Sequence, residues 1–460
     1  MVTSILSGID GFKGISIEIS CVVSRGSLSL LRNREFLALS GTAFARAQAY
    51  STILIALALY ADQFGTTSSV EGLFGTSIAI AQLVIVLPLG RYIDTHNAKR
   101  VLVVGLLINV LVFIGYGQVG SVADVLLIRV FQGFGASILW ITGSAVVGSV
   151  SPDDERGQWL GTYNQVGAFS SLAGDVIGGM LLTVYGFQET YAVLTAITLL
   201  ATVGAFLFIR DNPGGKKDPE QATGLETFRK LLDRSAIRAL VVFRLGLSFG
   251  KMAIIIFVPI YARTAFGMAP VLVGGILAGG KLTKALTQGI VGGYTDRVGH
   301  KHYFVISGAL IYALGTAMIP LAGYADLIAD PVSIAPAALV PFALPEGTSS
   351  ITLVPAFFVL FVAYGICGIA DSIRLPASMA LFVEEGEHFD AVAGSLSLRS
   401  IAWKIGQVLG PVTVGVIWDA TSVSVAFLTA AGFIVVATLT FVAMYHVEPA
   451  PEVQPSVADD

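Results

Sequence analysis

Charged side chains inside long apolar segments are the residues of this sequence whose types suggest chemistry. Nine of them are basic: Arg46, Arg129, Arg244, Lys251, Lys281, Lys284, Arg374, Arg399 and Lys404. Two are acidic, Asp175 and Asp371. Ion pairing cannot neutralise an excess of seven positive charges, so the other bases must be hydrated, deprotonated in the case of lysine, or bound by an anion. The pattern favours a site that binds an anionic solute.

The spacing of the basic residues indicates which of them can act together. Arg244 and Lys251 are seven positions apart and share one face of a helix, and Lys281 and Lys284, three apart, do the same. A pair on one face can point into one water-filled space. Eight bases are therefore our candidates for substrate binding: Arg46, Arg129, Arg244, Lys251, Lys281, Lys284, Arg374 and Lys404.

The two interior acids have a different chemical use. A carboxylate inside a membrane can carry a proton, so Asp175 and Asp371 are the candidates for proton coupling. Structural alternatives stay open for some of these charges. Asp371 and Arg374 are three positions apart and can pair with each other, and Arg399, near the membrane surface, can extend its head group toward water.

Composition places these charges in a membrane protein. The chain has 460 residues, of which 55% are hydrophobic and 13% charged, and its mean hydropathy is +0.79. Soluble domains have about one quarter charged residues. The net charge of −4 is small and the bases are confined to particular segments, which excludes a nucleic-acid surface. We expect the partners to be membrane lipid and a small-molecule substrate.

The sequence shows no pattern typical of a metal site or a cofactor. Cys21 lies in a polar-flanked stretch and Cys367 in an apolar run, with no CxxC motif or histidine cluster near either. A phosphate-binding GxxxxGK[ST] loop is not evident. We therefore expect no metal, no cofactor and no disulfide. The energy for transport should come from an ion or solute gradient, with the proton as the candidate ion.

Twelve runs are long and apolar enough to cross a bilayer. A helix needs about twenty mainly apolar residues to span a hydrocarbon core of about 30 Å, because only helices or closed barrels satisfy the backbone in lipid. We place the spans near 37–60, 70–93, 101–120, 122–149, 157–184, 188–209, 237–263, 269–294, 302–323, 354–383, 391–418 and 423–446. The predicted fold is an all-α integral membrane protein.

The distribution of Lys and Arg predicts the orientation. About seventeen of the 27 lie before the first span, after the last, or in and beside the loops that follow even-numbered spans. The opposite loops keep essentially one, Arg263. Because positive loops stay in the cytoplasm, we expect a multi-pass protein of the cell membrane with both termini cytoplasmic.

Breaks in hydropathy divide the chain into two groups of six spans. The polar stretch 211–236 contains several helix breakers and separates the sixth span from the seventh. A second long connection, 324–353, has no Lys or Arg and should lie outside the cell. We predict a cytoplasmic extension (1–36), an amino-terminal six-helix bundle (37–209), a central cytoplasmic loop (210–236), a carboxy-terminal six-helix bundle (237–446) and an acidic cytoplasmic tail (447–460).

One loop pattern recurs six spans later. Residues 90–100, GRYIDTHNAKR, follow the second span, and residues 292–302, GGYTDRVGHKH, follow the eighth. The second copy has the pattern G-x-x-x-D-R-x-G-x-K through Gly292, Asp296, Arg297, Gly299 and Lys301. The first copy keeps Gly90, Asp94 and Lys99, with Thr95 and Asn97 in place of the arginine and the second glycine.

Motifs within three spans complete a resemblance. The fourth span reads LLIRVFQGFGAS, in which Arg129 precedes Gly133 and Gly135. The fifth and eleventh spans carry the glycine-rich sets Ser170, Gly174, Asp175, Gly178 and Gly179, and Gly406, Gly410, Pro411 and Gly415. With the repeated loop and the twelve spans, residues 37–446 resemble the major facilitator superfamily. The fifth span departs from the family motif because Asp175 replaces a proline.

The resemblance implies a fold of two pseudo-symmetric six-helix bundles, and we expect a monomer. The first, fourth, seventh and tenth spans would line a central cavity, and the third, sixth, ninth and twelfth, which have no interior charge, would face lipid. The repeated loops would form a cytoplasmic gate through Gly90, Asp94, Gly292, Asp296, Arg297 and Gly299. The alternative is that the loop aspartates are ordinary charged residues in contact with water and have no role in gating.

Close helix packing is the expected role of the small residues in the spans. Small residues let transmembrane backbones approach each other. The residues concerned are Gly133, Gly135, Gly174, Gly178, Gly410 and Pro411. The family fold also packs the fifth span beside the eighth, which predicts a contact between Asp175 and Lys281 or Lys284. The alternative is that Asp175 accepts hydrogen bonds from nearby serine or backbone groups.

These patterns favour a secondary active transporter that moves a small anionic solute, such as an organic acid, a phosphate ester or an oxyanion, by alternating access. A proton-coupled multidrug efflux antiporter is the first alternative, favoured by the motifs of the fourth and fifth spans. A drug-cation exporter should have a carboxylate in the interior of the first, fourth or seventh span, where none is found. A membrane-embedded sensor without transport is the second alternative. No catalytic motif is evident, so we do not expect an enzyme.

Overall fold

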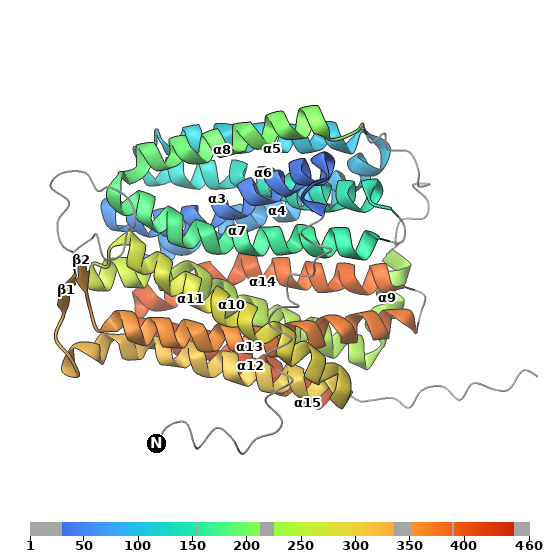
Figure 1. Ribbon diagram of the computed structural model, residues 1–460. Coiled ribbons are helices and arrows are strands. Elements are labelled where there is room, and N and C mark those ends of the chain that lie inside the picture. Colours follow the sequence, from blue (N-terminus) through green and yellow to red (C-terminus); the bar gives the residue numbers. More distant parts are fainter. Residues whose placement is uncertain (1–29, 153–154, 212–224, 335–350, 389–390, 446–460) are drawn as a thin grey trace, which may run out of the picture.

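Long helices that lie roughly along one axis make up nearly all of the described structure. The computed structural model describes residues 30–152, 155–211, 225–334, 351–388 and 391–445. A small antiparallel sheet of β1 (Val332–Ile334) and β2 (Ile351–Leu353) lies at one end of the bundle, and α9 (Leu225–Asp233) lies at the other (Figure 1). We call these the strand end and the α9 end.

Twelve long helices are present in this part of the chain, six in each half. The amino-terminal half contains α3 (Arg34–Phe64), α4 (Ser68–Thr95), α5 (Ala98–Tyr116), α6 (Val122–Val150), α7 (Arg156–Val184) and α8 (Gly186–Phe208). The carboxy-terminal half contains α10 (Ser235–Phe266), α11 (Pro270–Val298), α12 (Lys301–Met318), α13 (Ala356–Glu387), α14 (Val392–Ala420) and α15 (Val423–Met444). The all-α membrane fold predicted from the sequence is confirmed.

Eleven of these helices are long and apolar enough to cross a membrane. The remaining long helix, α11, has 29 residues, but Lys281 and Lys284 interrupt its apolar run. A helix of that length measures about 43 Å, which exceeds the thickness of a hydrocarbon core. The low hydropathy of α11 therefore reflects the charges it carries and not a shortage of length.

Local signals in the sequence explain where several helices begin and end. The side chain of Asn33 accepts hydrogen bonds from the first turn of α3, and Ser121 and Ser422 cap α6 and α15 in the same way. Gly65 and Gly267 follow the last residues of α3 and α10 with φ of 57° and 62°. A residue without Cβ adopts this left-handed conformation most easily, so the chain can reverse there.

The two halves have the same internal packing. In the amino-terminal half α3 packs on α7 and α8, and α6 packs on α4 and α5. In the carboxy-terminal half α10 packs on α14 and α15, and α13 packs on α11 and α12. Each pair in one half has its counterpart six long helices later. The predicted pseudo-symmetry of two six-helix bundles therefore holds in the described structure.

The peripheral helices present apolar side chains to the outside. Large hydrophobic residues are exposed along α5, α8, α12 and α15, and examples are Leu111, Leu200, Leu314 and Val436. Exposed apolar surface on this scale is stable in lipid and not in water. These are the third, sixth, ninth and twelfth long helices, which the charge pattern predicted to face lipid.

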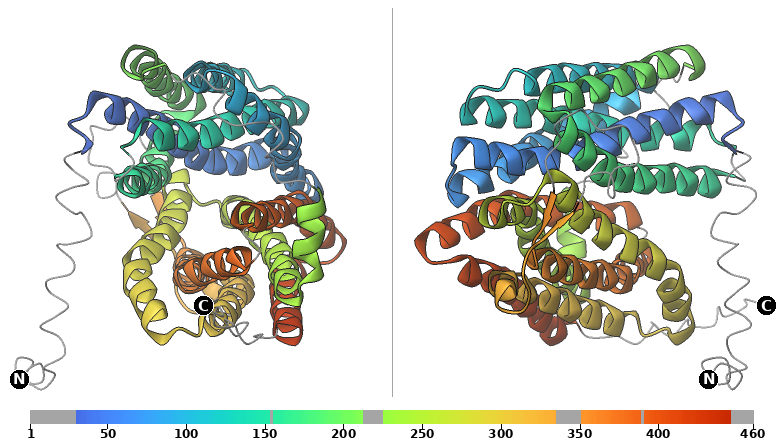
Figure 2. Two further views of the ribbon diagram at one scale, coloured as in Figure 1. Left: turned by 90° about the vertical axis from the view of Figure 1, so that its right-hand side faces the viewer. Right: turned by 60° about the vertical axis from the view of Figure 1, so that its left-hand side comes forward.

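Helices of one half meet helices of the other along three lines. α4 packs on α14, α7 packs on α11, and α3 packs on α10. Figure 2 shows the amino-terminal half, coloured blue to green, and the carboxy-terminal half, coloured yellow-green to red, as two separate groups of helices. Movements between the halves must therefore change these three contacts.

Several boundaries differ from the sequence prediction. The central segment, predicted as a loop over 210–236, contains the helix α9, because Leu231 packs into a small apolar cluster with Ile237 and Leu398. The ninth span ends as an α-helix at Met318, and a 3-10 helix, η3 (Ile319–Leu327), continues it. The predicted extension and tail lie almost wholly outside the described residues, at 1–29 and 446–460.

Candidate transport site

Side chains from one half cap helices of the other half at the strand end. Asp419 of α14 accepts hydrogen bonds from the backbone nitrogens of Ser68 and Ser69, both at 2.8 Å, where α4 begins. Thr183 of α7 accepts one from the backbone nitrogen of Val271, at 2.9 Å, where α11 begins. Both caps satisfy N–H groups that a helix leaves without an internal partner. The two interfaces are thus closed at the strand end in equivalent ways.

Deeper in the α7–α11 interface, Lys281 of α11 reaches into the amino-terminal half. Its Nζ lies 2.6 Å from Oδ2 of Asp175. It also donates to the hydroxyls of Ser51, at 2.8 Å, and Ser171, at 2.7 Å. Asp175 is fully buried, whereas the Lys281 side chain is 31% exposed. The predicted contact between Asp175 and one of two lysines is therefore present, and Lys281 makes it.

Lys404 has the corresponding position in the α4–α14 interface. Its Nζ donates to Oε1 of Gln82, on α4, and to Oε1 of Gln407, on its own helix, at 3.2 Å. One turn closer to the strand end, the hydroxyl of Thr76 donates to the carbonyl oxygen of Val408 at 2.7 Å. Both acceptors of Lys404 are neutral amide oxygens, and both glutamines are buried.

The described contacts show which end of the molecule is closed. Asp62 and Arg263, at the strand-end termini of α3 and α10, form a further ion pair between the halves, with 2.9 Å between Nη2 and Oδ2. The described hydrogen bonds and ion pairs that join the halves extend from there to the level of Lys281 and Lys404. The structure is therefore a conformation closed at the strand end.

Arg46 and Arg244 lie on the α9 side of these contacts, and each stacks on a tryptophan. The guanidinium carbon of Arg46 lies 4.1 Å from the ring centre of Trp140 on α6, and that of Arg244 lies 4.2 Å from Trp403 on α14. The Nε of each arginine is buried and has no hydrogen-bond partner within the described part of the chain. Each guanidinium is therefore attracted to a ring face and keeps a buried N–H group without a described partner.

Lys251 has a different environment from the two arginines. It forms an ion pair with Asp371, and the same carboxylate pairs with Arg374 on its own helix. Both cations also lie near the ring of Tyr312, at 5.4 and 5.3 Å from its centre. The pairing of Asp371 with Arg374 that the spacing allowed is present. No described contact joins Arg46, Arg244 and Lys251.

The remaining candidate bases are placed separately. Arg129, 1% exposed, donates to the carbonyl oxygen of Phe74 at 2.8 Å and to Gln132 at 2.7 Å, and so ties α6 to α4. The side chain of Lys284 is partly exposed, on the face of α11 that carries Lys281. Arg129 is therefore held within the amino-terminal half in this conformation, and a substrate contact by it stays a prediction.

The gating motifs are described in part. The side chains of Asp94, Gly292 and Asp296 lie outside the described ones. Arg297 is exposed near the α9 end of α11, and Gly299, with φ of 76°, ends that helix. Gly90 has open space where a Cβ would stand. The gate itself therefore remains the expectation that the resemblance gave.

Small residues of the glycine motifs lie against backbones of neighbouring helices. A Cβ on Gly174 would lie 2.4 Å from the carbonyl oxygen of Gln48, and one on Gly410 would lie 2.3 Å from that of Phe249. The other members make similar approaches: Gly133 to Ile78, Gly135 to Asn109, Gly178 to Thr52, and Pro411 to Gly72 and Gly75. At Gly133, Gly174 and Gly410 the atoms approached belong to backbones, so a larger side chain there requires a shift of the helices; at Gly135 and Gly178 they belong to the side chains of Asn109 and Thr52.

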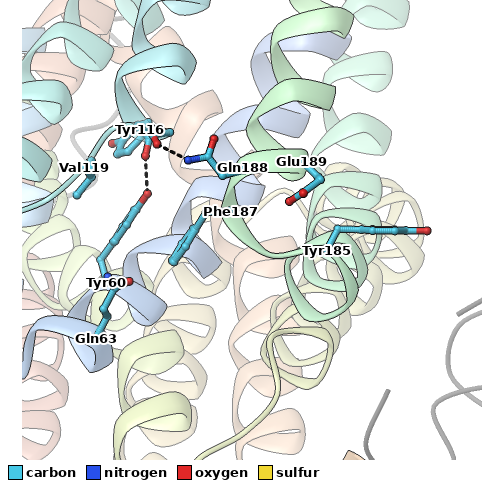
Figure 3. A pocket seen from close by; sticks show the side chains of 9 residues that line it. Tyr60, Gln63, Tyr116, Val119, Tyr185, Phe187, Gln188 and Glu189 are labelled. Carbon is cyan, nitrogen blue, oxygen red and sulfur yellow. Dashed lines mark hydrogen bonds between the residues drawn. The ribbon is translucent and has the colours of Figure 1, made fainter. Parts of the chain in front are cut away.

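One cavity lies away from all predicted site residues. It has a volume of about 260 Å³ at the strand end of the amino-terminal half, and its lining includes Tyr60, Tyr116, Phe187 and Gln188 (Figure 3). Tyr60 stacks on Phe187 with 4.4 Å between ring centres and donates a hydrogen bond to the carbonyl oxygen of Tyr116. These internal contacts make the aromatic group a structural cluster at the strand end of α3, α5 and α8.

Sequence reasoning missed the neutral partners of the charged candidates. Gln82 and Gln407 hold Lys404, Ser51 and Ser171 hold Lys281, and two tryptophans cover the arginines. Polar uncharged residues inside apolar spans were a usable signal, because a buried amide or hydroxyl needs a partner. A search for glutamine and serine at mid-span would have found four of these six residues.

The family model described as Major Facilitator Superfamily matches this chain over residues 39–342 and 248–460. The chain belongs to this superfamily. It is therefore a membrane transporter by family, consistent with the helices described above. The superfamily assignment made from the sequence motifs is confirmed.

Three curated relatives illustrate the range of superfamily members that this chain resembles. An uncharacterized MFS-type transporter of Methanocaldococcus jannaschii is 23% identical over 57% of this chain and 68% of its own length. A homologue of the multidrug resistance efflux pump PmrA from Lactococcus lactis is 24% identical over 56% and 65%. Multidrug resistance protein 2 of Bacillus subtilis is 22% identical over 81% and 85%.

Solved structures of superfamily transporters have the same fold. A POT family transporter in complex with a thioalcohol-conjugated peptide has a TM-score of 0.68 at 14% identity, covering 89% of this chain and 96% of its own. A bacterial homologue of the human lysosomal transporter Spinster, inward-facing and occupied, has a TM-score of 0.63 at 14% identity, with the same coverage. At these identities the likeness concerns the fold.

Proposed function

We propose that this superfamily member is a secondary active transporter of a small anionic solute. The observation that carries the proposal is the pair of arginines, Arg46 and Arg244, each with a buried N–H that has no described partner and a tryptophan on one face. Arginine offers N–H groups in a planar fork that matches carboxylate and phosphate groups. One such arginine stands in each half, so a bound anion can interact with both halves.

The charge balance of the described interior supports the same substrate class. Asp175 is matched by Lys281, and Asp371 by Lys251 and Arg374. The other six bases within the spans have no described ion pair: Arg46, Arg129, Arg244, Lys284, Arg399 and Lys404. Charges of one sign repel each other at low dielectric, so a site of this composition favours an anion over a cation.

The proposed mechanism is alternating access between the two halves. The strand end is closed by the caps at Asp419 and Thr183 and by the Asp62–Arg263 pair. Access to the arginines from that end requires the α4–α14 and α7–α11 contacts to open. Lys and Arg are abundant at the α9 end, whereas the loops at the strand end have essentially one, Arg263. Because positive loops stay in the cytoplasm, we infer that the α9 end and both termini are cytoplasmic.

A ligand screen tests the substrate class. Full-length purified protein is heated with single candidates, comprising citrate, inorganic phosphate, glucose 6-phosphate, ethidium and tetraphenylphosphonium. A ligand that binds the folded state raises the unfolding temperature by mass action. We expect at least one anion to raise it in the wild type and to lose this effect in Arg244→Gln. The matched control is Arg238→Gln, at an exposed position of the same helix, which should keep the effect.

The same screen decides between anion transport and multidrug efflux. Two of the relatives named above are called multidrug resistance proteins or efflux pumps, so a proton-coupled drug antiporter is the second candidate function. An increase in unfolding temperature with ethidium or tetraphenylphosphonium alone would support it and overturn the anion proposal. Counterflow of the ligand found, measured in proteoliposomes, then separates transport from a sensor that binds without transport.

A further inference from the structure

Lys404 has surroundings unlike those of the other interface lysine. Its two described partners, Gln82 and Gln407, are both amides and both buried, with exposed fractions of 9% and 7%. A neutral amine has two N–H bonds to donate, and two amide oxygens accept them here. An ammonium group would have a third N–H and a full charge, for which no described side chain provides a partner.

No described ion pair joins Lys404 to the charged groups of α14, α10 or α13. On α14 itself, Arg399 lies five positions away, and on α10 Arg244 stacks on Trp403, the residue next to Lys404. On α13, Asp371 is already paired with two other bases. None of these groups offers a negative charge to an ammonium group at Lys404.

The other elements packed against α14 offer no nearby counter-charge. On α4, Glu71 bonds to Thr66 at the strand end, about 16 Å along the helix from Gln82, and Asp94 lies about 18 Å away in the other direction. α9, at the far end of the bundle, carries Glu226, Arg229, Lys230 and Asp233 in its sequence, and α15 has no charged residue within Val423–Met444. A carboxylate partner for Lys404 is therefore missing among the described side chains.

Access to water completes the geometry. Lys404 is partly exposed. Contacts between Thr76 and Val408, and between Gly72 and Pro411, close the interface on the strand side of Lys404. Its exposed part therefore faces the α9 end. A proton can leave the amine toward that side and not toward the strand end.

We propose that Lys404 carries the coupling proton of this transporter, being neutral in the conformation closed at the strand end and protonated when α4 and α14 separate there. This inference rests on the proposed function of secondary transport. On closure, one N–H bond of the ammonium breaks, its electron pair stays on Nζ, and the proton passes to water at the α9 end. On opening, Nζ leaves Gln82, becomes hydrated from the strand end and takes up a proton from that side.

The proposal predicts how pH shifts the conformational equilibrium. The closed form binds one proton fewer at Lys404 than the open form, so raising the pH favours closure, by at most about tenfold per pH unit. A hydrated lysine has a pKa of about 10.4, so the open form keeps its proton at neutral pH. Lys404→Gln is always neutral and should be closed at every pH. Lys404→Arg is always charged and should be open at every pH.

Spin-label distances measure this equilibrium directly. Full-length protein with Cys21→Ser, Gln63→Cys and Thr421→Cys places one label on each half at the strand end, both at exposed positions. Distances are recorded in lipid nanodiscs from about pH 6 to about pH 11, a range that includes the pKa of a hydrated lysine, about 10.4. The control Arg238→Gln removes an exposed charge of α10 and should keep the wild-type profile.

Two results would overturn the role of Lys404. One is a pH profile that stays unchanged in Lys404→Gln, which would assign the titration to another group. The other is a Lys404→Arg variant that closes like the wild type at high pH, which would make the contact with Gln82 a simple hydrogen bond. These measurements need no substrate. A negative ligand screen would therefore not affect the conclusion about Lys404, and a negative result for Lys404 would not affect the conclusion about the substrate class.

Discussion

The α7–α11 and α4–α14 interfaces occupy equivalent places in the two-fold design of the protein but use opposite chemistry. At the strand end, the α7–α11 interface has a neutral cap, Thr183, and the α4–α14 interface has a charged one, Asp419. At mid-depth the order reverses: Lys281 meets a carboxylate, whereas Lys404 meets amides. Each interface thus contains one charged contact, placed at a different depth.

This difference indicates that the two interfaces respond to different conditions. The charged contact of α7–α11 is buried, where breaking it leaves an uncompensated carboxylate. The charged contact of α4–α14 is exposed at the strand end, where water and salt screen it. We infer that α7–α11 is the more rigid line of contact and that α4–α14 is the line that opens first.

The largest predicted effect is on stability at the buried ion pair. Lys281→Met leaves Asp175, which is fully buried, without its cation, and should lower the free energy of unfolding by about 3 to 5 kcal/mol. Lys404→Met leaves two amides that can bond to each other or to water and should lower it by about 1 kcal/mol. Thermal unfolding of the two variants in one detergent makes the comparison.

The double variant Asp175→Asn with Lys281→Met is the control for this ranking. It removes both charges and should recover most of the stability lost in Lys281→Met, because no ion remains buried without a partner. Equal losses in Lys281→Met and Lys404→Met would contradict the difference drawn between the two interfaces.

The next effect is steric and should be similar in both interfaces. A Cβ on Gly274 would lie 2.1 Å from the carbonyl oxygen of Asp175, and one on Gly415 would lie 2.2 Å from that of Ser68. Because these atoms belong to backbones, alanine at either position should lower stability by about 1 to 3 kcal/mol. Strand-end label distances should lengthen in both variants. Gly204→Ala, on α8 with open space around it, is the control: it should not lower stability, because alanine favours a helix by up to about 1 kcal/mol over glycine, and it should leave the label distances unchanged.

The sequence predicted the helices and their grouping well because lipid leaves few other solutions. An apolar run of about twenty residues must form a helix, and interior charges must avoid lipid. The third, sixth, ninth and twelfth spans have no interior charge and were therefore predicted to face lipid. The Asp175–Lys281 contact also followed, since the family fold sets which spans are neighbours.

The partners of individual bases could not be predicted, for a physical reason. Whether Lys251 meets Asp371 or solvent depends on how α10 and α13 are rotated about their axes, and charge spacing along one helix does not determine that rotation. Asp419 caps a helix that begins 351 positions earlier in the chain, where Thr67 makes no side-chain cap. The helix α9 was not predicted because it has only nine residues, too few for its apolar face to give a clear periodic pattern.

A smaller effect distinguishes the two strand-end caps. Asp419→Asn keeps an oxygen for the N–H groups of α4 but loses the charge, which interacts favourably with a helix N-terminus, and should cost about 1 kcal/mol at low salt. Thr183→Val removes a neutral acceptor from one N–H group and should cost about 0.5 to 1 kcal/mol at any salt concentration. Unfolding measured at low and high salt separates them; a salt-independent loss in Asp419→Asn would contradict the charged role.

The smallest effect is expected where α3 meets α10, between the two interfaces. Asp62 and Arg263 join the halves at 2.9 Å, but their side chains are 41% and 28% exposed. An exposed ion pair contributes at most about 1 kcal/mol and is screened by salt. Arg263 also donates to the carbonyl oxygen of Met268, at 3.1 Å, so part of its position is fixed without Asp62.

Asp62→Asn should therefore change the unfolding temperature very little and shorten the lifetime of the closed strand end only at low salt. Relaxation of the strand-end label distance after a pH jump, recorded at two salt concentrations, checks this. A loss of unfolding free energy in Asp62→Asn as large as that in Lys281→Met would show that the α3–α10 contact, and not α7–α11, holds the strand end closed.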